Sequence, residues 1–282
     1  MANSTKDPVI VTTHIKKGGT GKTTITYNGA FFLAIKKDLK VLVIDLDPSG
    51  NMTARFKRLL DGDLDYTTKN TVWNIFAEKE TEPIPVAKNI DLICGSEDYY
   101  DLEKQVEKDG RGRQQLRKWF FSNREMLRQY DYILIDTHND FSLFTENALV
   151  LSDLVLTVAE VDEDSMKELE KEEEKIERLR MQLEDVATGE SPVVAKVIKV
   201  GNKVQTNTGD SHKFQRTFNK LVEDPESGFY GYFDFRVYFA KTKTTAEPLV
   251  VLESRAKTKG DKEFFKRTWA LYEKIYNVQQ GA

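Results

Sequence analysis

Residues 14–24 of the chain read HIKKGGTGKTT. Gly18, Gly19 and Gly21 allow a tight turn, and Lys22 follows them at once. Residues 8–15 before this stretch are mostly β-branched and apolar, as in a buried parallel strand, and a helix is expected over residues 22–37 after it. A glycine-rich turn between a strand and a helix directs successive backbone N–H groups at one anion. The stretch therefore predicts a phosphate-binding loop.

This loop contains the side chains that nucleotide binding requires. The Lys22 ammonium is placed to bind the β- and γ-phosphates, and the Thr23 hydroxyl is placed to bind Mg²⁺. The expected nucleotide-binding residues are Lys17, Gly18, Gly19, Thr20, Gly21, Lys22, Thr23 and Thr24. Lys17 is a second lysine beside the loop, and a single phosphate site does not explain it, because one lysine is enough to hold the phosphates.

Two later segments with a strand pattern end in carboxylates. Residues 40–47 end in Asp45 and Asp47, and residues 130–137 carry Asp136 near their end. A lysine after glycines is common by chance, whereas a phosphate loop followed in order by strand-terminal aspartates is a far more specific signal. The combination makes nucleotide binding the firmest expectation from the sequence.

Strand-like apolar segments alternate with helix-length polar segments along the chain. Besides the three segments above, the strands are expected over residues 89–95, 153–161 and 192–200. This alternation predicts an α/β fold, a mostly parallel twisted sheet with helices on both faces. We expect a single domain over residues 9–282 after a short arm of residues 1–8.

One of the expected helices falls within residues 160–190, which are rich in Glu and Lys at helical spacing. We interpret its charged side as a solvated face and not as a binding site. Its buried side is expected to carry Met166, Leu169, Ile176, Leu179 and Leu183. Flexible loops are expected over residues 203–210 and 224–231, because these contain Asn, Thr, Gly and Pro.

The composition limits the classes of function. The net charge of −4 argues against a histone-like DNA coat, and Cys94 as the single cysteine excludes a disulfide framework, an iron–sulfur cluster or a cysteine zinc site. The sequence has neither a signal-peptide pattern nor an apolar run that could span a bilayer. We therefore expect a cytoplasmic protein without a membrane partner.

Lys17 is explained by a resemblance to a known family. KGGTGKTT, residues 17–24, resembles the deviant Walker A motif of the ParA/MinD ATPases, whose signature is the first lysine. VLVIDLDPSGN, residues 41–51, is similar to the family's second motif, which usually ends in DPQGN. YDYILIDTHNDFSLFTENAL, residues 130–149, is similar to its Walker B strand and the loop after it. The resemblance extends over nearly the whole chain and is strongest to ParA partition ATPases of plasmids or chromosomes.

Two of the motifs depart from the family pattern. The loop after Asp136 reads Thr137, His138, Asn139, Asp140 where the family usually has a threonine or cysteine, two prolines and a serine. Ser49 stands where glutamine is usual. We interpret His138 as a polar loop residue without a catalytic role, and His14 and His212 in the same way.

The resemblance implies a P-loop fold and an ATP-dependent mechanism. Two subunits would close around two ATP molecules, with Lys17 of one reaching phosphates held by the other. Lys17, Lys22 and Asp47 form the catalytic set, in which Asp47 orients the attacking water. Thr23 would bind Mg²⁺ directly, with Asp45 and Asp136 supporting it through water. Asn202 is a candidate near the adenine, although an asparagine turn explains it nearly as well.

The charge distribution points to DNA as a partner. Residues 191–282 contain 16 Lys and Arg against 10 Asp and Glu, so this third of the chain is basic. The resemblance implies that the ATP-bound dimer binds DNA here without sequence preference, on the nucleoid, and that a centromere-binding protein stimulates the ATPase. The candidate DNA-binding residues are Arg236, Lys241, Lys243, Arg255, Lys257, Lys259 and Lys262. A competing interpretation is a solvated basic face around a helix whose Phe265, Trp269, Tyr272 and Tyr276 pack inward.

Two other classes of function remain open. One is a MinD-like positioning ATPase with little DNA binding, although the chain ends in WALYEKIYNVQQGA without the basic amphipathic helix expected of it. The other is a P-loop scaffold that binds ATP as a structural ligand, and the altered loop after Asp136 is the reason to keep it. Nitrogenase-reductase and arsenite-pump relatives need more cysteines than Cys94.

Overall fold

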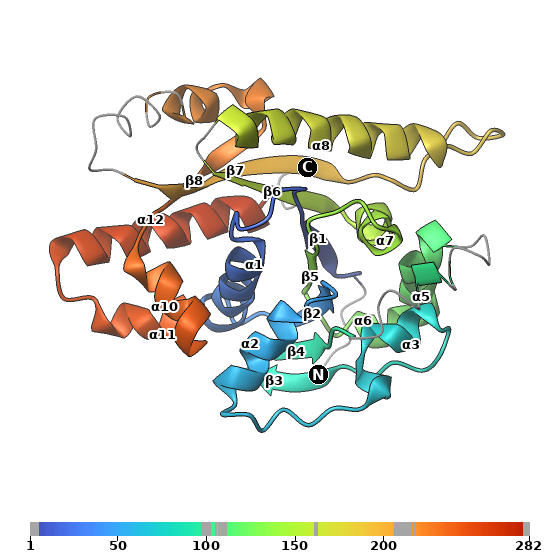
Figure 1. Ribbon diagram of the computed structural model, residues 1–282, viewed down its shortest axis with the longest axis horizontal. Coiled ribbons are helices and arrows are strands. Elements are labelled where there is room, and N and C mark those ends of the chain that lie inside the picture. The colour runs from blue at the N-terminus through green and yellow to red at the C-terminus, as the bar shows by residue number, and fades with distance from the viewer. Residues whose placement is uncertain are drawn as a thin grey trace.

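One sheet forms the centre of the protein (Figure 1). The computed structural model describes residues 6–96, 103–104, 106, 112–160, 163–205, 216 and 218–278. Within these residues eight strands run in the order β3-β4-β2-β5-β1-β6-β7-β8. All neighbours pair in parallel except β3 and β4. The expected mostly parallel sheet is confirmed.

All six expected strands are present, at bounds close to the expected ones. They are β1 (Val9–Thr13), β2 (Val41–Leu46), β4 (Ile90–Ile93), β5 (Tyr132–Thr137), β6 (Leu154–Glu160) and β7 (Lys196–Val204).

Two edge strands were not expected, β3 (Ile84–Ala87) and β8 (Phe229–Asp234). β3 contains Pro85, which is tolerated at a sheet edge but weakens the strand pattern. β8 begins within residues 224–231, so the expectation of a flexible loop there is wrong at its end. Residues 206–210 of the other expected loop lie outside the described residues.

The sheet is covered by helices on both faces. The α-helices are α1 (Lys22–Phe31), α2 (Asn51–Leu59), α3 (Val72–Phe76), α5 (Gln115–Ser122), α6 (Arg124–Leu127), α7 (Leu143–Leu151), α8 (Glu163–Gln182), α10 (Val237–Thr245), α11 (Leu249–Leu252) and α12 (Lys259–Tyr276). A π-helical turn, η1 (Phe32–Lys36), extends α1 over the expected length. Short 3₁₀ turns are η2 (Thr68–Asn70), η3 (Gly112–Gln114), η4 (Pro225–Ser227) and η5 (Glu253–Arg255).

Successive residues of the central strands belong to different cores. Val41 and Val43 of β2 contact the core formed with α1, α2 and α12, whereas Leu42 and Ile44 contact the core formed with α3, α5 and α7. Side chains alternate across a strand, so a strand buried on both faces is apolar throughout. Figure 1 shows α1 and α12 on one side of the sheet and α5 and α7 on the other.

Helix α12 fixes the position of α1. The inward packing of Phe265, Tyr272 and Tyr276 is confirmed, because all three are buried, and Trp269 is half-buried. The Tyr272 hydroxyl donates to the Ile25 carbonyl at 3.0 Å, and the Tyr272 ring stacks on Phe32. The helix that follows the phosphate loop is therefore held by the C-terminal helix.

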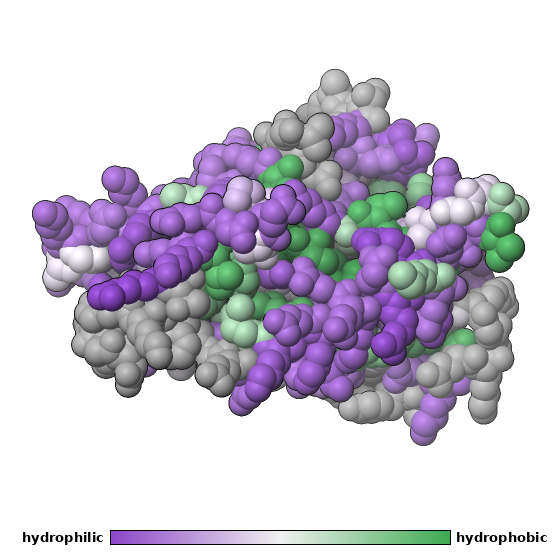
Figure 2. All heavy atoms as spheres, turned by 90° about the horizontal axis from the view of Figure 1, so that it is seen from above, coloured by the Kyte–Doolittle hydropathy of each residue, from purple (hydrophilic) through white to green (hydrophobic). Residues whose placement is uncertain are grey.

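Helix α8 covers β6 with the expected buried side. Leu169, Ile176 and Leu179 are buried, and Met166 and Leu183 are half-buried. Most of its Glu and Lys residues are at least partly exposed, as a solvated face requires. On the face of the molecule that Figure 2 shows, hydrophilic side chains dominate and hydrophobic ones form only small patches.

Candidate functional site

The loop between β1 and α1 has the conformation of an anion-binding turn. Gly19 and Gly21 have φ of +79° and +101°, values that favour glycine because it has no Cβ. At Gly21 a Cβ would also collide with the Asn202 side-chain amide. The Asn202 Nδ2 donates to the Thr20 carbonyl at 2.6 Å, so Asn202 of β7 holds the loop in place.

Lys22 lies beneath this loop and not in solvent. Its Nζ donates to the carbonyls of Ile15 at 3.1 Å and Lys17 at 3.2 Å, and only 8% of the residue is exposed. Burial lowers the pKa of Lys22, and the nearby charges of Asp136 and Asp47 oppose that effect. The ammonium is thus positioned at the turn by backbone groups and balanced by carboxylates.

The structure brings Asp45 and Asp136 together at the carboxyl ends of β2 and β5, where the two residues are register partners. Asp45 is fully buried and accepts hydrogen bonds from the Thr53 backbone N–H at 2.8 Å and the Thr53 hydroxyl at 2.7 Å. Burial raises the pKa of Asp45 to about 6.

Asp136 is a buried carboxylate without a hydrogen-bond partner among the described residues, for both of its oxygens. Burial raises its pKa, and the nearby Asp45 raises it further, while the Thr23 hydroxyl and Lys22 lower it. An uncompensated buried carboxylate is costly, so this donor set suits a cation. Thr23, Asp45 and Asp136 offer the oxygen ligands that Mg²⁺ prefers.

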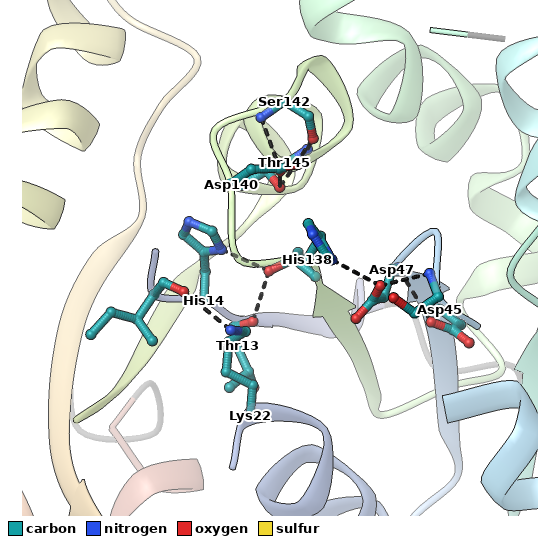
Figure 3. Close-up of polar contacts among 12 residues, drawn as sticks. Thr13, His14, Lys22, Asp45, Asp47, His138, Asp140, Ser142 and Thr145 are labelled. Atoms are coloured by element: carbon teal, nitrogen blue, oxygen red, sulfur yellow. Dashed lines mark hydrogen bonds and ion pairs between the residues drawn. The ribbon is translucent and has the colours of Figure 1, made fainter. Parts of the chain in front are cut away.

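Asp47 lies at the mouth of the site and contacts the loop that departs from the family pattern. Its Oδ1 accepts from the Ser49 backbone N–H at 2.8 Å and lies 3.0 Å from His138 Nδ1 (Figure 3). In the same loop Asp140 accepts from the Ser142 backbone N–H at 3.1 Å. The sequence indicated no role for His138 in the site, whereas the structure places its ring beside the Asp47 carboxylate.

These groups surround a cavity of about 480 Å³. Gly18, Lys22, Thr23 and Asp47 line its phosphate end, and Asn202 and the segment 234–236 after β8 line another part. Arg55 of α2 also lines it, although no sequence motif indicated that residue. A larger hollow of about 970 Å³ lies beside α5 and α7 and is lined by none of the predicted site residues. We place the functional site at the smaller cavity because the charged groups converge there.

The signature lysine contacts helix α8 of its own chain. Lys17 Nζ donates to the Ser165 hydroxyl at 2.8 Å. About two turns further along α8 lies Glu172, which is only 1% exposed and whose Oε2 accepts from the Lys16 backbone N–H at 3.3 Å. The expectation that the charged residues of α8 are all solvated is therefore wrong for Glu172, because it faces the phosphate loop.

His14 and Glu172 form a buried pair below the loop. The Thr137 hydroxyl donates to the Thr13 carbonyl, so it accepts from His14 Nδ1–H at 2.8 Å, and His14 Nε2 lies 3.1 Å from Glu172 Oε1. Burial lowers the pKa of His14 to about 3 and raises the pKa of Glu172 to about 7. This arrangement favours a neutral ring beside a protonated carboxyl. His212 lies outside the described residues.

The candidate DNA-binding residues lie on α10, η5 and the start of α12. Lys241, Lys243, Arg255, Lys257, Lys259 and Lys262 are exposed, and Arg236 is half-buried. Arg255 forms an ion pair with Glu247, and Arg236 and Lys243 also line the 480 Å³ cavity. The basic region is therefore continuous with the nucleotide site and not separate from it.

Comparison with known proteins identifies the family. A sequence profile described as an AAA domain matches residues 8–187, almost two thirds of the chain. The chain belongs to this family.

The sporulation initiation inhibitor protein Soj of Bacillus subtilis is 32% identical over 154 residues, 50% of this chain and 54% of Soj. The ParA family protein pGP5-D of Chlamydia psittaci is 26% identical over 147 residues, half of each chain. The expected ParA/MinD resemblance is confirmed, and the chain spans little more than half the length of these curated relatives.

Solved structures share the fold over nearly the whole chain. A putative plasmid partition protein of Borrelia burgdorferi bound to AMPPNP has a TM-score of 0.72 at 20% identity and covers 96% of this chain and 99% of its own. The McdA(D38A)–ATP complex of Cyanothece has a TM-score of 0.75 at 15% identity, covering 96% and 97%. These likenesses confirm the P-loop fold. Among the described residues, no helix combines the length and apolar character needed to cross a membrane.

Glu172→Gln tests the buried pair through the pH dependence of stability. Because the pKa of Glu172 is raised in the folded protein, its contribution to stability is full below its unfolded pKa and is lost as pH rises through about 7. His14 has a lowered pKa, so it is neutral in the folded protein but about half protonated in the unfolded chain at pH 6.5, and it adds a smaller change of opposite sign as pH rises. From pH 6.5 to 8 we expect Glu172 to account for a fall of about 1 kcal/mol in the free energy of unfolding.

Urea unfolding at the two pH values measures this slope. The variant should decline less steeply than the wild type, with the remaining slope coming from Asp45 and Asp136. Glu170→Gln, at an exposed position of the same helix, is the control and should keep the wild-type slope. Identical slopes for Glu172→Gln and the wild type would contradict the assignment.

Proposed function

We propose that this chain is a ParA-type partition ATPase that forms a dimer around ATP and binds DNA without sequence preference. The observation that carries the proposal is that Lys22 and Asp47 line one cavity beside the phosphate loop, while Asp45 and Asp136 lie buried and paired at the ends of β2 and β5, with charges that act on Lys22 or on each other. The Lys17 signature and the family membership support it. The chain would act as a single domain, as expected from the sequence.

Within this proposal ATP binds with its phosphates on the loop from Gly18 to Thr24. The N-terminus of α1 and Lys22 supply the positive potential. The base lies toward Asn202, whose Nδ2 is already bonded to the Thr20 carbonyl, so Asn202 couples the base end of the cavity to the loop. The cavity volume of about 480 Å³ lies within the range of small-molecule sites.

A divalent cation fits the carboxylate end of this cavity. Thr23, Asp45 and Asp136 would hold Mg²⁺, because Asp136 has two buried oxygens without partners among the described residues. When bound, Mg²⁺ supplies charge that neutralises phosphate oxygens.

Hydrolysis requires a water in line with the bond between the β- and γ-phosphates. Asp47 is placed to orient this water, because its carboxylate reaches the cavity while the Ser49 backbone N–H and His138 fix its direction. The attack breaks the β–γ bridge and yields ADP and inorganic phosphate, and Lys22 stabilises the charge that develops on the phosphate oxygens.

Lys17 is the residue that would link two subunits. In this conformation its ammonium is bonded to Ser165 of its own α8, so a role across the dimer interface requires the side chain to exchange that contact for the partner's phosphates. Dimer closure and the position of α8 are then coupled. Hydrolysis removes the γ-phosphate and releases the dimer, which makes ATP a timer for a binding state.

The DNA surface and the remaining partners belong to the same proposal. The dimer presents Lys241, Lys257, Lys259 and Lys262 twice, which strengthens contacts to phosphates of any sequence. The protein acts in the cytoplasm on the nucleoid, and a centromere-binding protein stimulates its ATPase.

A scaffold that binds ATP without turnover is the second candidate, favoured by the contact of His138 with Asp47. Steady-state ATPase activity, measured with and without DNA and a centromere-binding partner, separates the two. Turnover that rises with these additions supports the partition ATPase.

Asp47→Ala should leave ATP binding largely intact and slow hydrolysis by at least ~10²-fold, the scale of losing one positioned catalytic group. ATP-bound dimer should accumulate, as measured by single-turnover phosphate release and size-exclusion chromatography. Asp140→Ala, in the neighbouring loop, is the control for general disturbance of the site. Wild-type turnover in Asp47→Ala would remove Asp47 from the mechanism.

The two lysines should give different defects. Lys22→Ala should abolish tight nucleotide binding, because the loop loses its charge at the β- and γ-phosphates, whereas Lys17→Ala should preserve monomer binding and impair ATP-dependent dimerisation. Nucleotide titration and light scattering with a slowly hydrolysed ATP analogue measure the two properties. Undiminished dimer in Lys17→Ala is the result that contradicts the cross-subunit role.

Replacing Lys257, Lys259 and Lys262 together by Glu should weaken DNA binding to every sequence alike and leave ATP binding intact. For a wild-type dimer making roughly four to eight phosphate contacts, log affinity should fall with log salt at a slope near −0.9 per contact, and the variant should flatten this slope. The control with the same change in charge is Lys57, Lys69 and Lys79, all exposed, replaced by Glu. Absence of DNA binding by the ATP-bound wild type at ~50 mM salt would favour the scaffold.

A further inference from the structure

Arg55 is a buried guanidinium that lines the nucleotide cavity. It lies on α2 and only 6% of it is exposed. Its Nη1 and Nη2 donate to the Thr24 hydroxyl at 3.3 and 3.2 Å, and its Cζ lies 5.2 Å from the centre of the Tyr27 ring. Within the described part of the chain no carboxylate lies within ion-pair distance of it.

The surroundings of the Arg55 guanidinium favour the binding of an anion. A guanidinium has five N–H donors, and a single hydroxyl at more than 3 Å satisfies few of them. Burying an unpaired charge is costly, and burial indeed lowers the pKa of Arg55, with Asp136 as the main opposing charge. The planar fork of an arginine suits phosphate oxygens, which it can bind through two parallel N–H groups.

The position of Arg55 selects which phosphates it can reach. Thr24 is the third residue of α1 and follows Thr23, the expected Mg²⁺ ligand, by one position. Lys22 is the side chain expected at the β- and γ-phosphates, and the loop N–H groups cradle the α- and β-phosphates. A guanidinium at Thr24 therefore lies on the side of the phosphates that ADP shares with ATP.

Helix α2 is held at the site through a residue near Arg55. Thr53 binds the buried Asp45 with both its backbone N–H and its hydroxyl, and its hydroxyl also accepts from the Gly95 backbone N–H at 2.8 Å. Phe56, the neighbour of Arg55, is fully buried in the core with Tyr27. The Arg55 side chain is thus positioned by the same helix turn that holds the expected magnesium carboxylate.

We propose that Arg55 binds the α- or β-phosphate of the bound nucleotide from within its own subunit, through its guanidinium at Thr24. The inference rests on the proposed ATP-binding function and adds a residue that no motif assigns. The proposal gives Lys17 and Arg55 different roles. Lys17 acts in the ATP-bound dimer, whereas Arg55 helps the monomer to bind ADP and ATP alike.

Arg55→Met tests this role, because methionine keeps an apolar stem over Tyr27 and removes the donors. We expect the affinities for ADP and ATP to fall together by roughly 10- to 100-fold, the effect of losing charged hydrogen bonds to phosphate, with their ratio little changed. Arg55→Lys should lie between the variant and the wild type, since it keeps a charge but not the fork. Isothermal titration with ADP and with a slowly hydrolysed ATP analogue, in Mg²⁺, gives the values.

Lys57→Met is the matched control, because Lys57 is exposed on the same helix and should bind as the wild type does. Titration with AMP assigns the contact: a loss for AMP as large as for ADP indicates the α-phosphate, and a loss for ADP alone indicates the β-phosphate.

The alternative is that Arg55 only ties α2 to α1. In that case the melting temperature of the nucleotide-free Arg55→Met protein would fall while ADP affinity stayed within two-fold of the wild type, which would overturn the proposal. If Arg55→Met does not fold, wild-type ADP affinity in Arg55→Lys overturns it in the same way. A wild-type protein that binds neither ADP nor the ATP analogue would instead refute the proposed function itself.

Discussion

The arrangement of the whole site depends on burying carboxylates beside a phosphate loop. Asp45 and Asp136 are fully buried and adjacent across β2 and β5, where like charges and loss of water both oppose ionisation. The fold offsets part of this cost with Lys22 beneath the loop and with Thr53 on Asp45. Asp136 is left without a hydrogen-bond partner in the described chain. The unpaired Asp136 carboxylate fits a site that binds a cation and a phosphate group together. The cation would balance the charge of the carboxylates and of the phosphate oxygens.

A second set of buried polar groups connects the loop to its surroundings. Glu172 of α8 receives the Lys16 backbone N–H and faces His14, and Asn202 of β7 binds the Thr20 carbonyl. The loop is therefore fixed from two directions by side chains far away in sequence. These contacts explain how a glycine-rich turn, which has little preference of its own, is held in one conformation before any ligand binds. The loop loses most of its conformational entropy during folding, so ligand binding costs less entropy.

The sequence predicted the fold and the strand, loop and helix around the phosphate loop well and the edges of the sheet poorly, for a physical reason. Most of the inner strands are largely apolar and buried on both faces, so their pattern is strong, and the loop and Asp45, Asp47 and Asp136 lie at or just after the carboxyl ends of β1, β2 and β5. The edge strand β3 contains Pro85 and β8 contains Gly231, and both residues interrupt a strand pattern. His138, Glu172 and Arg55 belong to segments whose local pattern is that of a loop or an amphipathic helix. Only the tertiary packing turns His138 and Arg55 toward the cavity and Glu172 toward the phosphate loop, and a single sequence does not encode these directions in any local spacing.

The proposed DNA surface is mechanically linked to the nucleotide site. Helix α1, which begins at the phosphate loop, is bonded to the residue after α10 and to the first residue of α11. The Tyr27 hydroxyl donates to the Ala246 carbonyl, and the Leu249 backbone N–H donates to Asn28 Oδ1 at 2.8 Å. Helix α10 in turn carries Lys241 and Lys243, and Lys243 lines the cavity. A shift of α1 on nucleotide binding would therefore move the basic region directly, because no flexible linker separates the two among the described residues of α1, α10 and α11. Under the proposed function, the nucleotide then controls the geometry of the DNA surface within one subunit, in addition to doubling that surface through dimerisation.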